Sequence, residues 1–148
     1  MKTFRFGQRS KDNIYGNNTQ PPINEKLQRV VERALIESTV DFTVISGYRT
    51  AEQQNALFKK DVSTLDGYEK KSYHQTGYAV DIMPIVKDSD GNKLPPFDTS
   101  NTTCLLAWHE VIRAFLRAGF KLGIHVTAGW VFNIGSGRDL GHFQIARG

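Results

Sequence analysis

The chain has 148 residues and a mass of 16.7 kDa, which is the size of one ordinary domain. Its 19 basic and 15 acidic side chains give a net charge of +4, but the largest basic runs are two Lys-Lys pairs, which excludes a nucleic-acid-binding stripe. The longest uncharged stretch, residues 122–137, is too short and too rich in glycine for membrane insertion, and one cysteine, Cys104, excludes a disulfide framework and a cysteine-cluster metal site.

The first predicted elements are a helix and a strand that follow an irregular N-terminal arm. Residues 1–22 show no hydrophobic period and are interrupted by glycine and proline. From Asn24, which can cap a helix, apolar residues recur through residue 35 at the spacing of an amphipathic helix. Alternating apolar and polar residues over 40–46 then predict a strand.

A second helix is predicted over residues 51–60. Thr50 and Gln53 form its capping box, and we expect the apolar residues 56–58 to face inward. After a polar loop, residues 78–83 are predicted to form a buried strand that ends at a proline.

The second half of the chain contains a predicted turn and a long helix. Residues 87–93 are predicted to form a hairpin centred on Asp90-Gly91, because a calcium loop would need an acidic residue at its twelfth position. A third helix is predicted over 103–118, with Gly119 as its stop. Six of the 13 glycines then fall within residues 119–141, a density typical of loops shaped around a functional site.

Two of the four histidines have a carboxylate at a suitable spacing. His74 lies seven residues before Asp81, whose apolar neighbours predict that it is buried and therefore needs a metal, a cation or several hydrogen bonds. Asp139 lies three residues before His142, and Gly141 allows the chain to turn between them. Two histidines and one carboxylate can hold a catalytic zinc ion, and a second carboxylate can act as general base. The same residues could instead form two acid–histidine hydrogen bonds without a metal.

Four motifs, in order, make the sequence similar to the M15 family of zinc peptidases, the D-Ala-D-Ala-type metallopeptidases that act on peptidoglycan. The motifs are Ser46-Gly47-Tyr48-Arg49-Thr50, Gln54 with Leu57-Phe58, the stretch S-Y-H-Q-T-G-Y-A-V-D at 72–81, and D-L-G-H-F-Q at 139–144. The resemblance covers a catalytic core at residues 24–146 of a single peptidase domain, 1–148. It implies an α+β, Hedgehog/DD-peptidase-like fold: a small, mainly antiparallel sheet with helices packed on one side and zinc in the cleft.

The resemblance also implies a role for individual residues. His74, Asp81 and His142 would bind one Zn²⁺ ion. Asp139 would be the general base, and Arg49 would stabilise the developing oxyanion. Contacts to the substrate are expected from four further side chains: Ser72, Tyr48, Gln54 and Trp130.

The residues of the last motif distinguish two activities within the family. An acid at Asp139, a glycine before His142 and the small size are more similar to phage endolysins that cleave the L-Ala-D-Glu bond of the stem peptide. Residues 127–130 are Thr-Ala-Gly-Trp, where such endolysins often carry Gly-Gly-Asp-Trp. The alternatives are a D,D-carboxypeptidase that removes terminal D-Ala and a non-enzymatic wall-binding domain with structural zinc.

The resemblance further implies where the protein acts. Without a recognisable signal peptide, we expect a monomer made in the host cytoplasm that reaches the bacterial cell wall after release by a separate factor. Its partner would be the peptidoglycan stem peptide, and its diffuse positive charge suits an anionic wall.

Overall fold

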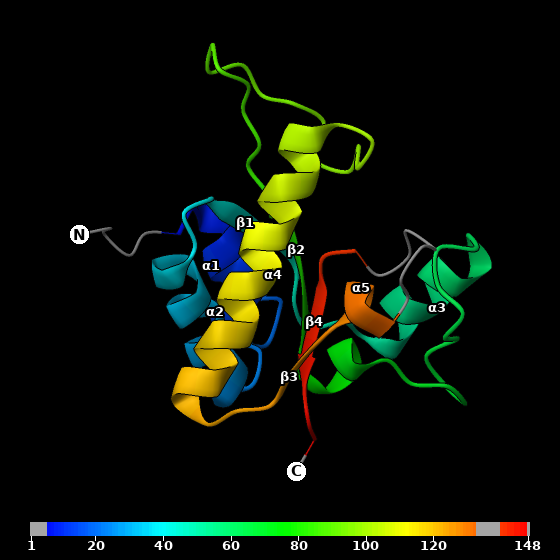
Figure 1. Cartoon of the computed structure of the whole chain (residues 1–148). Helices are drawn as coiled ribbons and strands as arrows, with labels where there is room; N and C mark the ends of the chain where they lie inside the picture. The colour runs from blue at the N-terminus through cyan, green and yellow to red at the C-terminus, as the bar shows by residue number, and fades with distance from the viewer. Residues whose placement is uncertain (1–5, 133–139, 148) are drawn as a thin grey trace.

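The computed structural model describes residues 6–132 and 140–147. Figure 1 labels its helices and strands. In chain order these are α1 (Gln8–Tyr15), α2 (Glu25–Glu37), β1 (Phe42–Ser46), α3 (Ala51–Lys59), the 3₁₀ helix η1 (Tyr73–Thr76), β2 (Ala79–Pro84), α4 (Thr102–Leu122), β3 (Val126–Ala128), α5 (Gly129–Phe132) and β4 (His142–Ile145). Over the described residues, no helix combines the length and the apolarity needed to cross a membrane.

The described strands form one sheet in the order β1-β2-β4-β3, and each neighbouring pair is antiparallel. The predicted α+β class with an antiparallel sheet is therefore confirmed. The strand β4 comes last in the sequence but lies between β2 and β3. Its register places His142 directly beside Asp81 of β2.

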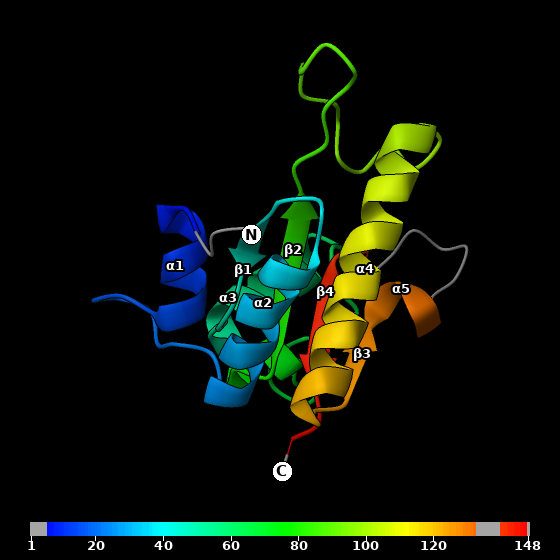
Figure 2. The same cartoon turned by 60° about the vertical axis from the view of Figure 1, so that its left-hand side comes forward.

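The two faces of the sheet carry different layers. The helices α2 and α4 lie on one side and α3 and α5 on the other, while α1 lies beside the edge strand β1 (Figures 1 and 2). On β4, Phe143 and Ile145 are buried, whereas His142 and Gln144 alternate with them and are only partly covered. Phe143 stacks on Phe115 of α4 with ring centroids 3.9 Å apart. The face packed on the long helices therefore forms the core, and the other face is left for a site.

The prediction of an irregular arm over residues 1–22 is wrong for α1. Ile14 of this helix is fully buried, and Ser10 Oγ accepts a hydrogen bond from the Val44 amide at 2.9 Å. The Asn13 side chain donates to the Val44 carbonyl oxygen at 2.8 Å. Hydrogen bonds to the edge strand β1 thus hold α1, and such contacts leave no hydrophobic period in the sequence.

The capping box and bounds of α3 match the prediction closely, but its inward face does not. Gln54 is the residue of α3 that is fully buried, and Phe58 is 42% exposed. The expectation that residues 56–58 face inward is therefore wrong for Ala56 and Phe58, which are exposed, whereas Leu57 is half-buried. The buried position is taken by Gln54, whose hydrogen bonds, described below, compensate the burial of a polar side chain.

The helix α4 does not stop at Gly119 as predicted but continues to Leu122. Gly123, in the left-handed conformation at φ 69°, is its C-cap. A Cβ atom at Gly119 would lie 2.6 Å from the carbonyl oxygen of Ile124 and from the Val126 side chain. This glycine is therefore required for close packing of the helix against the start of β3.

The hairpin predicted at residues 87–93 is confirmed. Lys87 pairs with Lys93 as an antiparallel bridge, and Gly91 has the positive φ of 83° that such a turn favours. The connection between β2 and α4 extends away from the sheet, at the top of Figure 2.

Candidate metal centre

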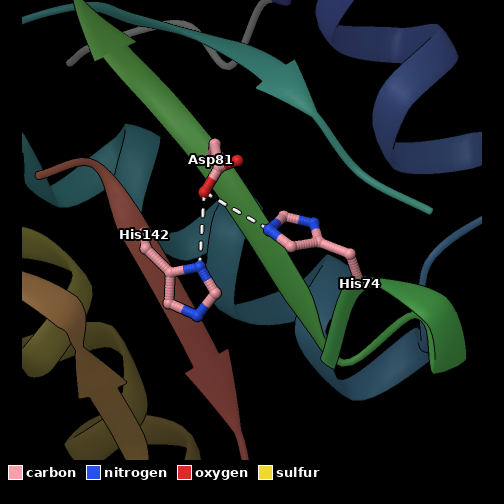
Figure 3. A group of neighbouring side chains, drawn as sticks. All are labelled: His74, Asp81 and His142. Carbon is pink, nitrogen blue, oxygen red and sulfur yellow. Dashed lines mark ion pairs between the residues drawn. The ribbon is translucent and has the colours of Figure 1, made fainter. Parts of the chain in front are cut away.

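Three side chains predicted as metal ligands converge on one point (Figure 3). His74 comes from η1, Asp81 from β2 and His142 from β4. Asp81 Oδ1 lies 3.3 Å from His74 Nε2 and 3.3 Å from His142 Nδ1. One potential ligand atom of each residue lies within 4.8 Å of the others, so the three could hold a single metal ion.

Local turns bring these residues together. Ser72 and Gln75 form a capping box around η1, and Gly77 ends it at a left-handed φ of 77°. This turn folds His74 back over β2, as the glycine in the sequence suggested. Next to His142, Gly141 has a φ of 96°, and its carbonyl oxygen accepts from the Ile82 amide at 2.9 Å.

The remaining ring nitrogens of both histidines are engaged by protein acceptors. His74 Nδ1 lies 2.8 Å from the carbonyl oxygen of Gly47, and His142 Nε2 lies 2.8 Å from Gln144 Oε1. Because a carbonyl oxygen can only accept, each of these nitrogens carries the proton in a neutral ring. In that tautomer, His74 Nε2 and His142 Nδ1, which face Asp81, are the nitrogens that could ligate a metal. The donor set therefore fits zinc.

The Asp81 carboxylate is held in its charged form. Burial would raise its pKa, but the charge and the hydrogen bonds that protonated His74 and His142 rings supply oppose this effect and bring the pKa well below its ordinary value. Its second oxygen, Oδ2, lies 3.3 Å from Arg49 Nη2. Burial lowers the pKa of Arg49, an effect that Asp81 opposes. An ionised carboxylate is the form that ligates a metal.

The cluster lies in a small pocket of about 140 Å³. One part of the lining is polar and includes the cation of Arg49, while Leu57, Val62 and Leu65 make an apolar part. The described lining residues are Arg49, Leu57, Val62, Ser63, Leu65, Ser72, His74, Asp81 and His142. A metal in this pocket would have both a cation and an apolar surface beside it.

Of the other predicted site residues, Arg49 and Ser72 line this pocket. Ser72 is buried, and its Oγ also accepts from the His74 amide at 3.2 Å. Tyr48 lines a neighbouring pocket of about 420 Å³, which shares Arg49 and Leu57 with the first. The two pockets therefore adjoin at Arg49 and Leu57.

The remaining three predicted site residues, Gln54, Trp130 and Asp139, are not among the described residues that line this pocket. Gln54 is fully buried behind Arg49, with Arg49 Nη1 donating to Gln54 Oε1 at 2.7 Å. The Trp130 ring packs edge-on against His109 of α4, with ring centroids 5.1 Å apart. Asp139, the predicted general base, lies outside the described residues.

Sequence reasoning missed the residues that support the ligands. The Gly47 carbonyl oxygen fixes the His74 ring, and Gln144 fixes the His142 ring. Gln144 could have been found, because residues two apart on a strand share a face. No side-chain pattern signals the Gly47 contact, because a backbone carbonyl makes it.

The α+β fold and the two-histidine, one-carboxylate cluster define a class of protein with a candidate mononuclear metal site next to an arginine. Residues 2–141 match the family described as phage L-alanyl-D-glutamate peptidase, and the chain belongs to that family. The predicted resemblance to peptidases of this kind is confirmed.

Two similar proteins support this membership. The L-alanyl-D-glutamate peptidase of Escherichia phage T5 is 32% identical over 147 residues, which cover 99% of this chain and 92% of that protein. The crystal structure of the Serratia marcescens L-Ala D-Glu endopeptidase ChiX superposes with a TM-score of 0.69 at 26% identity. That match covers 95% of this chain and 89% of ChiX.

Proposed function

We propose that this protein is a zinc-dependent peptidoglycan hydrolase, an endolysin that cleaves the L-Ala-D-Glu bond of the stem peptide. The observation that carries the proposal is the convergence of His74, Asp81 and His142 in a pocket that also contains Arg49. The family and the names of the T5 and Serratia relatives support the scissile bond.

The three ligands are proposed to hold one Zn²⁺ ion. When bound, such an ion lowers the pKa of a water molecule toward neutrality and polarises the scissile carbonyl group. The protein contributes the orientation of the ligands, through Gly47 behind His74 and Gln144 behind His142. Losing such supporting partners commonly weakens metal binding about 10- to 100-fold.

Two residues are proposed to act on the reacting groups. The Asp139 carboxylate takes a proton from the attacking water and passes it to the leaving amine, a role that rests on the family resemblance. The Arg49 guanidinium lines the pocket and stabilises the negative charge that develops on the carbonyl oxygen.

The pocket is proposed to accept the stem peptide around the alanine. The apolar part formed by Leu57, Val62 and Leu65 suits a methyl side chain. Ser72, Tyr48 and Trp130 remain proposed contacts for the peptide on either side. A single monomeric domain would act at the bacterial wall after a separate factor releases it from the host cytoplasm.

The test of the scissile bond is product analysis by mass spectrometry on purified stem peptide with zinc. We expect one product that ends in L-Ala and one that begins with D-Glu. Release of single D-Ala residues would move the assignment to a D,D-carboxypeptidase. Binding to the cell wall without cleavage of the stem peptide would instead support the alternative of a non-enzymatic wall-binding domain.

The test of the proposed base and ligands is a pair of substitutions. Asp139→Asn should keep bound zinc and lose at least about 100-fold in rate, as removal of a general base commonly does. His74→Ala should lose the zinc itself, measured by atomic absorption. His125→Ala, an exposed histidine outside the cluster, is the matched control. Full activity of Asp139→Asn would contradict the mechanism.

A further inference from the structure

The carboxamide of Gln54 is fully buried on the inward face of α3, where an apolar residue would be expected. Its oxygen accepts a hydrogen bond from Arg49 Nη1 at 2.7 Å. Its nitrogen donates to Ser63 Oγ and to the carbonyl oxygen of Leu65, each at 2.9 Å. A buried amide is costly unless it is hydrogen-bonded, and these bonds explain why a polar side chain is tolerated here.

Gln54 is one of the anchors that fix the Arg49 guanidinium. On the other side of this group, Nη2 donates to Ser46 Oγ at 3.1 Å and to Asp81 Oδ2 at 3.3 Å. A guanidinium is planar and rigid, so anchors on both terminal nitrogens determine its plane. If the Gln54 anchor were lost, the bonds to Nη2 would still hold one end of the cation, but its plane could rotate.

The other end of the Gln54 carboxamide is itself held in place. Ser63 Oγ also accepts a hydrogen bond from the Leu65 amide at 3.1 Å. Residues 63–65, which accept the hydrogen bonds of the Gln54 amide, therefore form a turn closed by their own hydrogen bond. The neighbouring Asn55 side chain donates to the carbonyl oxygen of Asp66 at 3.0 Å and ties the same segment to α3. Gln54 is therefore a fixed support rather than a mobile side chain.

We propose that Gln54 is a positioning residue that acts on the reaction through Arg49 and does not touch the substrate. This inference rests on the proposed function, in which Arg49 stabilises the developing negative charge. It replaces the predicted substrate contact of Gln54, because both of its amide protons and its oxygen are engaged by protein atoms. Its effect should fall on turnover rather than on substrate binding.

The first experiment compares kcat, KM and zinc content for the wild type and Gln54→Met, which is nearly isosteric and removes the hydrogen bonds. We expect kcat to fall about 10- to 100-fold, as misplacement of a catalytic group does, with KM and bound zinc nearly unchanged. A raised KM with unchanged kcat would mean that Gln54 binds substrate and would overturn the proposal.

Two further variants separate the contact with Arg49 from the support of the loop. Gln54→Glu keeps an acceptor for Arg49 but places a carboxylate oxygen against the carbonyl oxygen of Leu65, so it should retain more turnover than Gln54→Met while losing stability. Asn55→Ala frees the same loop without touching Arg49, and its kcat should stay within about twofold of wild type. A loss in Asn55→Ala as large as in Gln54→Met would assign the effect to the loop and refute a role through Arg49.

The decisive test is a double-mutant cycle with Arg49→Ala. If Gln54 acts through Arg49, adding Gln54→Met to Arg49→Ala should lower kcat by no more than about twofold further. If the two substitutions instead reduce kcat independently, so that their effects multiply in the double variant, the proposal for Gln54 is overturned. The proposed function still stands in that case, provided that the wild type cleaves the stem peptide. A wild-type protein that cleaves no stem peptide would instead count against the proposed function. If Gln54→Met does not fold, Gln54→Leu, which also removes the hydrogen bonds, takes its place in the cycle, and multiplying losses in that cycle would refute the inference.

Discussion

At the scale of single residues, Gly47 has two functions at once. Its carbonyl oxygen orients the His74 ring, and its Cα faces the backbone of α1. A Cβ atom at this position would lie 2.1 Å from the carbonyl oxygen of Asn13, closer than any real contact allows. The packing of an N-terminal helix and the orientation of a metal ligand thus depend on the same glycine.

We therefore expect Gly47→Ala to lower both stability and metal affinity. The overlap should cost about 1–3 kcal/mol in the free energy of unfolding, the range for overpacking, measured by urea denaturation. The displaced carbonyl should weaken zinc binding about 10-fold, measured by competition with a chelating dye. Gly7→Ala, with nothing within 4 Å of its added Cβ, is the control and should leave zinc affinity unchanged. Equal zinc affinity for Gly47→Ala and wild type would contradict this role.

The ligand cluster could be predicted from the sequence, whereas the support of Arg49 could not. Asp81 was recognisable because a carboxylate occupies a position with apolar neighbours, and Gly77, three residues after His74, indicated the required turn. The role of Gln54 depends on the path of the loop through Ser63, which no local periodicity encodes. Long-range hydrogen bonds of this kind are set by tertiary structure alone.

At the scale of elements, Glu110 connects α4 to the segment between α2 and β1. Its Oε2 accepts from the amide and the hydroxyl group of Thr39 at 2.7 and 2.9 Å, and its Oε1 lies 2.7 Å from Arg113 Nε. The hydrogen bond with Arg113, helped by those with Thr39, lowers the pKa of Glu110 to about 2. A charged group near the middle of α4 thus ties this helix to the segment that follows α2.

This tie predicts a specific loss of stability in acid. Because the pKa of Glu110 is lower in the folded state, its stabilising contribution is complete above the ordinary glutamate pKa of about 4.5 and disappears as the pH falls toward about 2. Glu110→Gln should therefore be less stable than wild type at pH 7 and lose less stability between pH 4.5 and 2. Urea midpoints across this range measure both effects, with exposed Glu69→Gln as the control for net charge. Parallel curves for Glu110→Gln and wild type would show that the tie contributes nothing.

Element boundaries were predictable where a local cap sets them. The capping boxes at Thr50 and Ser72 are local signals, and α3 begins where its box predicts. The helix α1 was not predicted because its support comes from Val44, which lies 31 residues after Asn13 and 34 after Ser10. Gly119 was mistaken for the end of α4 because a glycine required for close packing against Ile124 and Val126 looks the same in the sequence as a glycine that ends a helix.

At the scale of the whole molecule, the proposed metal joins parts of the chain that are far apart in the sequence. His74, Asp81 and His142 belong to η1 and to the two inner strands. An ion bound only by the folded state stabilises it in proportion to the logarithm of its concentration relative to its dissociation constant.

Removing the metal should therefore lower the melting temperature. With zinc at about 1,000 times its dissociation constant, chelation should shift Tm by about 10 °C for a domain of this size. Differential scanning calorimetry with and without a chelator measures the shift. His74→Ala should have the same Tm with and without the chelator. A wild-type Tm that the chelator does not change would contradict a metal ion bound by residues of three elements.

The position of β4 has a consequence for how the protein is made. Because β4 is the last of the described strands along the chain yet lies between β2 and β3, the ribosome delivers the middle of the sheet after its flanks. Until then β2 has an unpaired edge, open to other chains, and the third ligand is missing. A nascent or prematurely terminated chain therefore lacks the complete site, so a proposed wall-cutting activity would begin only once synthesis has passed residue 142.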